Sequence, residues 1–157
     1  MIRYQWSDVE GDIAILINQI EDYLNSSGEQ NGIIVGIHRG GLVPAVMLSH
    51  ALDLPMKSLE WQTRDQGKNL NALELDRILF NRPTDSVVLF VDEIADSGET
   101  INSIQNHISE YISKYRLPVK SCFAVLVQRT ACRLDVPVLF ARTLNSNVWV
   151  HFPWEAD

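Results

Sequence analysis

The chain has 157 residues, of which 46% are hydrophobic and 21% are charged, and its formal net charge is −7. This length and composition predict one globular domain that spans residues 1–157. The negative charge argues against nucleic acid as a sequence-independent partner, because such binding needs a basic surface. An anionic small substrate stays possible where a metal ion or a local basic cluster offsets the charge.

The N-terminal segment and the cysteines predict a cytoplasmic protein. Residues 1–8 contain no long apolar run of the kind that a signal peptide needs. The longest apolar runs have the length of a strand, so we expect no stable association with a membrane. Cys122 and Cys132 form no CxxC motif, and the four histidines show no metal-ligand spacing. We therefore expect no disulfide framework.

Strand-like and helix-like segments alternate along the chain. Ser7 and Glu10 form a capping-box pattern, and apolar residues at helical spacing continue to Leu24, which predicts a helix that ends near residues 26–28. The other elements that we expect are strands at 33–37, 55–61, 86–91, 119–127 and 138–144 and helices at 42–52 and 100–114. This alternation indicates an α/β fold with a mostly parallel twisted sheet flanked by helices.

The end of the strand at 86–91 carries the densest group of polar residues. Asp92 and Glu93 stand where this buried strand is expected to end, and the turn Asp96–Thr100 then leads into a helix. Ligands of parallel sheets bind where strands end and helices begin. Two adjacent acids at that point need a cation or a hydrogen-bond donor to offset their repulsion.

The turn itself has the composition of a phosphate cradle. Gly98 lets the backbone approach a ligand closely, while Ser97 and Thr100 add hydroxyl donors beside the amides of a helix N-terminus. The alternative is that Asp96 or Ser97 merely caps the helix.

A second glycine turn follows the strand at 33–37. Arg39, Gly40 and Gly41 stand between this strand and the helix at 42–52. Paired glycines permit backbone shapes that other residues avoid, and they let amides face a pyrophosphate. A turn of this kind between a strand and a helix can also be purely structural.

Together these motifs resemble the signature of type I phosphoribosyltransferases, which bind 5-phosphoribosyl-1-pyrophosphate (PRPP). That signature is a hydrophobic strand, two acids, two small or apolar residues, Asp, Ser or Thr, Gly, any residue and Thr. The first turn resembles the PRPP loop of the 6-oxopurine members, which often holds a cis peptide bond that precedes no proline. Residues 147–155 resemble the C-terminal hood of bacterial xanthine-guanine phosphoribosyltransferases. The likeness runs from about residue 33 to 155 and implies the type I phosphoribosyltransferase fold with a small C-terminal hood.

The resemblance implies a Mg²⁺-dependent enzyme that converts a 6-oxopurine (guanine, xanthine or hypoxanthine) and PRPP to the nucleoside 5′-monophosphate and pyrophosphate. Asp96 would be catalytic and handle the proton at N7 of the purine, and Asp92 would face Mg²⁺, in part through water. The residues implied to bind PRPP and its phosphates are Arg39, Gly40, Gly41, Asp92, Glu93, Ser97, Gly98, Glu99 and Thr100. The residues implied to bind the base are Arg129, Trp149 and Val150.

Departures from the family pattern leave some assignments open. Arg129 stands where the family usually has a Lys that donates to the 6-oxo group of the purine. If the alignment shifts by one residue, Gln128 takes that place instead. The polar segment 62–71, which we interpret as a mobile loop, lacks the usual Ser-Tyr pair. Its Arg64 and Lys68 are candidates to close over pyrophosphate, but they would equally suit solvated loop charges.

The resemblance also implies a homodimer or a homotetramer whose partners are small-molecule substrates. Three alternatives remain at this level. The first is a phosphoribosyltransferase for another base, such as a pyrimidine. The second is a regulator that senses PRPP without turnover, and the third is a plain α/β interaction domain.

Overall fold

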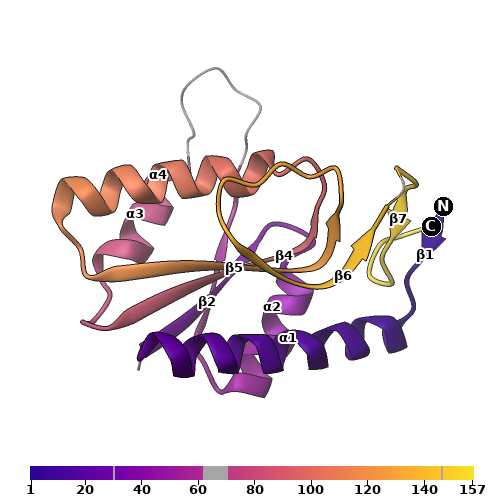
Figure 1. The fold of residues 1–157 in the computed structure, drawn as a ribbon, viewed down its shortest axis with the longest axis horizontal. Helices are drawn as coiled ribbons and strands as arrows, with labels where there is room; N and C mark the ends of the chain where they lie inside the picture. The colour runs from indigo at the N-terminus through magenta and orange to yellow at the C-terminus, as the bar shows by residue number, and fades with distance from the viewer. Residues whose placement is uncertain (30, 62–70, 146) are drawn as a thin grey trace.

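The computed structural model describes residues 1–29, 31–61, 71–145 and 147–157. Within these residues, helices flank a five-stranded parallel sheet, and a two-stranded sheet lies at one end of the molecule (Figure 1). The predicted α/β class is confirmed. In chain order the elements are β1 (Ile2–Arg3), α1 (Trp6–Ser27), β2 (Asn31–Ile37), α2 (Leu42–Leu52), β3 (Met56–Leu59), α3 (Ala72–Phe80), β4 (Ser86–Ala95), α4 (Glu99–Tyr115), β5 (Val119–Arg129), β6 (Val138–Leu144) and β7 (Val150–His151).

The large sheet has the strand order β3-β2-β4-β5-β6, and every neighbouring pair is parallel. All five strands therefore end at the same edge. Since β2 and β4 are neighbours in register, with Ile34 opposite Leu89, the turns that follow these two strands begin side by side. This arrangement brings the two glycine turns of the sequence to one place.

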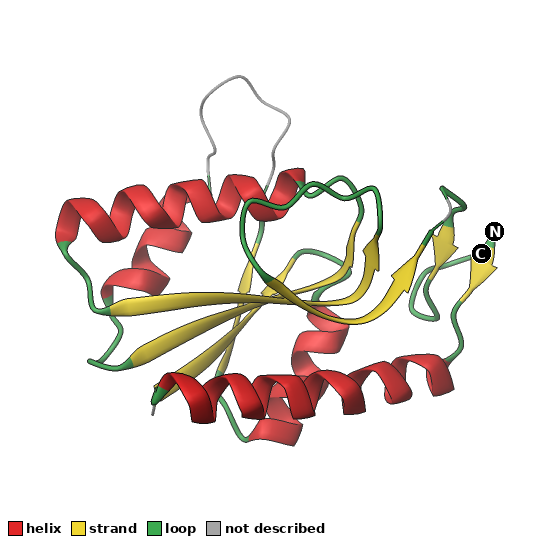
Figure 2. Cartoon of the chain, viewed as in Figure 1, coloured by secondary structure: helices red, strands yellow, loops and turns green. Residues whose placement is uncertain are grey.

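Helices cover both faces of the sheet, α1 and α2 on one side and α3 and α4 on the other (Figure 2). On the first face Leu16 of α1 belongs to the same buried cluster as Leu89 of β4. On the second face Ile104 of α4 packs in a cluster with Phe90 and Phe123, whose rings stack with centroids 5.2 Å apart. Strands buried on both faces explain why the sequence shows continuous apolar runs rather than alternation. None of the helices in the described part of the chain is long and apolar enough to cross a membrane.

The start of α1 differs from the prediction. The capping box expected at Ser7 and Glu10 is wrong, because the helix already begins at Trp6. The N-cap is Gln5, and its backbone N–H donates to the Asp8 carboxylate over 2.9 Å. The carboxylate three residues after the N-cap thus satisfies an amide outside the helix, as in a capping box shifted by two residues.

Other elements also differ from the predictions. β4 continues to Ala95, beyond the predicted end at residue 91, because β5 keeps pairing with it through Ile94 opposite Val127. Helix α3 was not predicted. The pairing of β1 with β7, with Ile2 opposite Val150, was not predicted either, since it joins segments almost 150 residues apart.

Candidate active site

The first predicted phosphate turn lies against the two acids of β4 at the carboxyl edge of the sheet. A methyl group on Gly41 would overlap the carbonyl oxygen of Val91 and would lie 2.9 Å from Cα of Asp92. A methyl group on Gly40 would overlap the carboxylate of Glu93. The paired glycines therefore do more than permit a turn, because only residues without side chains allow the first turn to lie against the acids.

The first turn has a defined backbone path. The peptide bond between His38 and Arg39 is cis, as the resemblance implied. The His38 N–H donates to the carbonyl of Leu59 over 2.9 Å, and the Gly41 N–H donates to the carbonyl of Ile37 over 3.0 Å. These bonds fix both ends of the turn, while the Arg39 side chain is exposed to solvent.

The two acids of β4 lie in an environment that disfavours their charged forms. Burial, and then the charge of Glu93, raise the pKa of Asp92 well above its usual range. Burial, and then the charge of Glu155, raise the pKa of Glu93 to about 7, although Arg39 acts in the opposite direction. The Oδ1 atom of Asp92 accepts from the Glu93 backbone N–H over 2.8 Å, and Oε2 of Glu93 is buried without a hydrogen-bond partner. Such a pair is stabilised by a cation or a donor at the site.

The second turn is held from outside by the loop between β5 and β6. Gly98 has a φ of 91°, and a side chain there would overlap the carbonyl oxygen of Arg133. The Arg133 N–H donates to the Ser97 carbonyl over 3.1 Å, and Nδ2 of Asn102 donates to the Arg133 carbonyl over 2.8 Å. Helix α4 begins at Glu99, directly after the glycine, so its first amides border the turn. Sequence reasoning missed Asn102, because its partner is 31 residues away.

Arg129 joins the second turn to the hood, residues 147–155. Its Nε donates to the Oδ1 of Asp96, and its Nη2 donates to the carbonyl of Val148 over 2.8 Å. The Arg129 side chain is 9% exposed, whereas that of Asp96 is 70% exposed. The neighbouring Gln128 has a buried Oε1 without a hydrogen-bond partner. Arg129 and Gln128, the two candidates to recognise the base, therefore both lie at the end of β5. Arg129 is hydrogen-bonded to Asp96, the predicted catalytic acid.

Trp149 and Val150 lie in the hood next to the carbonyl that Arg129 contacts. Trp149 is 67% exposed and makes no ring contact with another described residue. The carbonyls of Trp149 and His151 accept from the N–H groups of Ile2 and Tyr4 over 2.8 and 2.9 Å. Since successive carbonyls of a strand point to opposite edges, the Val150 carbonyl is directed away from β1. An unpartnered indole and an outward carbonyl suit the recognition of a planar base.

A series of aromatic rings connects the hood to the N-terminal segment. The rings of Tyr4 and Phe152 have centroids 5.1 Å apart, and those of Phe152 and Trp154 are stacked at 5.0 Å. Trp6 continues the series, with its ring centroid 6.0 Å from that of Trp154. The stack joins the start of the chain to its end and fixes the hood on the N-terminal turn of α1.

A buried carboxylate anchors this stack to the sheet. Asp12 of α1 is 1% exposed and accepts from the Tyr4 hydroxyl over 2.7 Å and from Nη2 of Arg142 over 2.8 Å. Burial, and then the hydrogen bond with Asp12, raise the pKa of Tyr4. Sequence reasoning missed this group, although a signal existed: Asp12 stands at helical spacing between Val9 and Leu16, which places a charge on the apolar face of α1.

Two further predictions cannot be compared with the structure. The mobile loop expected at 62–71 falls on residues 62–70, which lie outside the described residues, and so do its Arg64 and Lys68. Among the residues that are described, no group of three or more His, Cys, Asp or Glu side chains is arranged to hold a metal ion by itself.

The chain belongs to the phosphoribosyltransferase family, because a family model described as phosphoribosyl transferase domain matches residues 4–157. The family identified from the sequence is thus confirmed. Among the similar curated proteins, xanthine-guanine phosphoribosyltransferase of Cereibacter sphaeroides is 27% identical over 141 residues, which are 84% of this chain and 75% of the relative. The protein of that name from Nitratidesulfovibrio vulgaris is also 27% identical over 141 residues, 85% of this chain and 74% of the relative.

Solved structures agree in fold. A purine phosphoribosyltransferase from Pyrococcus horikoshii superposes with a TM-score of 0.73 at 24% identity, and the match covers 99% of this chain and 94% of that one. The xanthine-guanine-hypoxanthine phosphoribosyltransferase of Helicobacter pylori gives a TM-score of 0.67 at 22% identity, covering 98% and 90% of the two chains. These likenesses confirm the type I phosphoribosyltransferase fold that the sequence predicted.

Proposed function

We propose that this chain transfers the 5-phosphoribosyl group of PRPP to a 6-oxopurine and releases pyrophosphate. One observation carries the proposal: a single edge of the sheet holds both PRPP-type turns and, linked to the second turn through Arg129, a hood with an exposed tryptophan. The names of the curated relatives, which are xanthine-guanine phosphoribosyltransferases, support the same reaction.

PRPP would lie across the two turns. The second turn and the first amides of α4 suit the 5′-phosphate, with Ser97 and Thr100 as hydroxyl donors and Glu99 contributing its backbone. Arg39 and Gly40 would hold the pyrophosphate next to the acids, because Gly40 lies against the Glu93 carboxylate. Catalysis then consists of stabilising the charge of the leaving pyrophosphate and holding the ribosyl carbon in line with the base.

The base would lie between the second turn and the hood. Trp149 would stack on the purine, and the Val150 carbonyl would accept from its ring N–H or 2-substituent. Asp96 would take the purine proton as the new glycosidic bond forms. Arg129 would donate to the 6-oxo group while its Nε holds Asp96. A cationic donor at this place disfavours the amino group of adenine and favours an oxo group.

The acids of β4 fit a divalent cation shared with the substrate. Mg²⁺ binds through one or two carboxylates together with substrate phosphates and keeps several waters. Asp92 and Glu93 supply carboxylates whose charged forms are destabilised in the isolated chain, and Glu93 has a buried oxygen without a partner. When bound, Mg²⁺ would supply positive charge against the pyrophosphate. Asp92 and Glu93 would also accept from the ribose hydroxyls and thereby orient the sugar.

The test is a spectrophotometric assay of the purified protein with PRPP and Mg²⁺ against guanine, xanthine, hypoxanthine, adenine and uracil. We expect turnover of at least one oxopurine and none of adenine, and we expect the rate to vanish when EDTA replaces Mg²⁺. Turnover of uracil alone would favour the phosphoribosyltransferase for another base. Binding of PRPP by calorimetry without turnover of any base would favour the PRPP-sensing regulator. An oligomer and a cytoplasmic location stay predictions that light scattering and fractionation test.

A further inference from the structure

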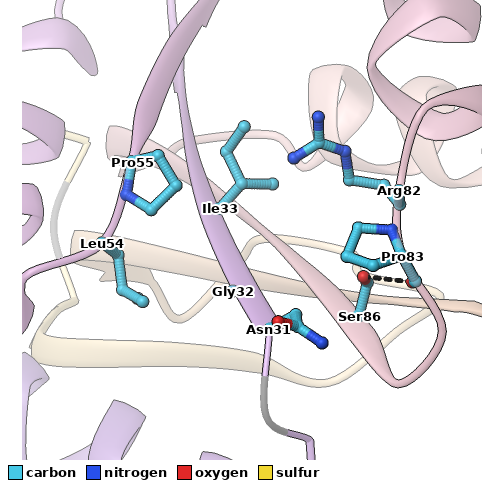
Figure 3. Close-up of a pocket in the computed structure, with 8 residues that line it drawn as sticks. All are labelled: Asn31, Gly32, Ile33, Leu54, Pro55, Arg82, Pro83 and Ser86. Carbon is cyan, nitrogen blue, oxygen red and sulfur yellow. Dashed lines mark hydrogen bonds between the residues drawn. The ribbon is translucent and has the colours of Figure 1, made fainter.

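A cavity of about 280 Å³ opens at the amino-terminal ends of β2 and β4, at the opposite edge of the sheet from the candidate active site (Figure 3). Since the seven residues of β2 are separated by six steps of roughly 3.3 Å, the two edges are about 20 Å apart. The described residues that line the cavity are Asn31, Gly32, Ile33, Leu54, Pro55, Arg82, Pro83 and Ser86.

Hydrogen bonds hold the walls of the cavity in place. Nδ2 of Asn31 donates to the carbonyl of Thr84 over 3.1 Å, and the Asn31 N–H donates to the carbonyl of Asp85 over 3.2 Å. These bonds tie the loop before β4 to the start of β2. On the other side, the Ile34 N–H donates to the Pro55 carbonyl over 2.9 Å. The cavity is therefore formed before any ligand arrives, which lowers the cost of binding.

Arg82 is the unsatisfied group of this cavity. Its Nε is buried without a hydrogen-bond partner, and its side chain forms no ion pair with another described residue. The guanidinium points toward Ile33 in Figure 3. The hydroxyl of Ser86 is already used, because it donates to the Pro83 carbonyl. Arg82 is half-buried, and it is the only charged residue among the described lining residues, so it is the group there that would attract an anion.

We propose that this cavity binds a small organic anion, with an oxyanion that accepts from Arg82 and an apolar body that lies against Leu54 and Pro55. Carboxylates and phosphate monoesters share this chemistry. A charge-assisted hydrogen bond is the strongest interaction that such a donor can make. The volume lies at the small end of ligand pockets, which suits a single-ring acid.

Benzoate is the probe, titrated into the ¹⁵N-labelled full chain without PRPP or base and followed by backbone amide shifts. We expect saturable shifts at Gly32, Ile33 and Ser86. Arg82→Gln should weaken binding by about tenfold or more, because it removes a charge-assisted bond. The matched control, Arg77→Gln, removes the same charge from an exposed position of α3 and should bind benzoate as the wild type does.

A second variant guards against loss of fold. A methyl group on Gly32 would lie 3.2 Å from Cδ1 of Leu54, so Gly32→Ala narrows the cavity and should also weaken benzoate binding. If Arg82→Gln melts well below the wild type, Gly32→Ala decides the outcome. A second titration with phenyl phosphate in place of benzoate then shows whether the cavity prefers a phosphate monoester or a carboxylate.

Three results would overturn the proposal. The first is equal binding of benzamide, the neutral molecule of the same shape, which would make the cavity merely apolar. The second is a set of shifts confined to Gly40 and Gly98, which would place benzoate in the active-site turns. The third is no shift at all. Because the titration uses neither substrate of the proposed reaction, its outcome is independent of that reaction.

Discussion

The two glycine turns and the hood lie at the same end of the molecule but are built in different ways. Each turn lies within one continuous segment of the chain, 36–44 for the first and 92–100 for the second. In each segment the end of a strand is followed by the glycine turn and then by the start of a helix. The hood, residues 147–155, is held by β1, by the aromatic stack and by Arg129, which come from distant parts of the sequence. Each turn takes its path from its own backbone, and the second is also held by Arg133, whereas the hood depends on packing and on one buried carboxylate.

Because of this difference, we expect substitutions in the turns and substitutions that affect the hood to change different measured quantities. Substitutions in the turns should change PRPP binding or the chemical step, because in the proposed function those side chains and amides would face the substrate. Substitutions beneath the hood should change the affinity for the base and the stability of the fold, because they act through position. The predictions below test this separation.

The largest effect is expected for Asp96→Asn, which removes the proposed acceptor of the purine proton. Turnover should fall by ~10²–10⁴, while the Kd for PRPP changes little. Steady-state kinetics and calorimetry measure the two quantities. Asp22→Asn, at an exposed position of α1, is the matched control and should retain wild-type turnover. Unaltered turnover in Asp96→Asn would remove this residue from the mechanism.

A smaller effect is expected for Gly98→Ala. The φ of 91° and the close carbonyl of Arg133 make a side chain costly there, so unfolding should be easier by about 1–3 kcal/mol and PRPP affinity should fall. Thermal melts and calorimetry report the two effects. Gly11→Ala is the matched control, because nothing lies within 4 Å of a methyl group at that position of α1. The control should gain about 0.5–1 kcal/mol of stability, since Ala favours helix over Gly. Equal PRPP affinity in Gly98→Ala and the wild type would contradict a phosphate role for the turn.

Tyr4→Phe tests the support of the hood. The variant keeps the ring of the aromatic stack but removes the hydroxyl that donates to Asp12, at a cost of about 1.5–3 kcal/mol for a hydrogen bond to a charged group. We expect a higher KM for the base with an unchanged KM for PRPP. Tyr115→Phe, on an exposed ring of α4, should change neither value. A rise in the KM for PRPP alone would contradict the separation of hood and turns.

The smallest effect concerns the pH dependence of stability in the ligand-free protein. Folding raises the pKa of Glu93 from 4.5 to about 7, because burial and the charge of Glu155 disfavour its carboxylate. The folded state therefore binds this proton more tightly than the unfolded chain. The stability that this proton contributes is fully present below pH 4.5 and is lost as the pH rises through about 7.

Glu93→Gln should flatten the fall in melting temperature between pH 5.5 and pH 8. Glu21→Gln, at an exposed position of α1, should leave it as in the wild type. An equal pH slope in Glu93→Gln and the wild type would show that Glu93 is charged throughout this range.

Sequence reasoning identified the turns well because their information is local. The acids at 92–93, the glycine at 98 and the hydroxyls at 97 and 100 lie within nine residues of one another, and a strand and a helix frame them. The extent of β4 was underestimated, since its last residues are strand only through their pairing with β5. The roles of these side chains toward PRPP, Mg²⁺ and the base stay predictions.

The sequence by itself determined the class of fold and the two glycine turns, because hydrophobic periodicity and turn chemistry act between neighbours in the chain. The family followed from the resemblance of its motifs to known proteins. Only the tertiary structure decided that Arg129 contacts Asp96 and Val148, and that Asp12 lies beneath the hood with Tyr4 and Arg142. It also decided that Arg82 faces a cavity without a described partner. The physical reason is that the partner of a buried charge is set by which surfaces meet when the sheet and its helices pack, and residues up to 130 positions apart supply those partners.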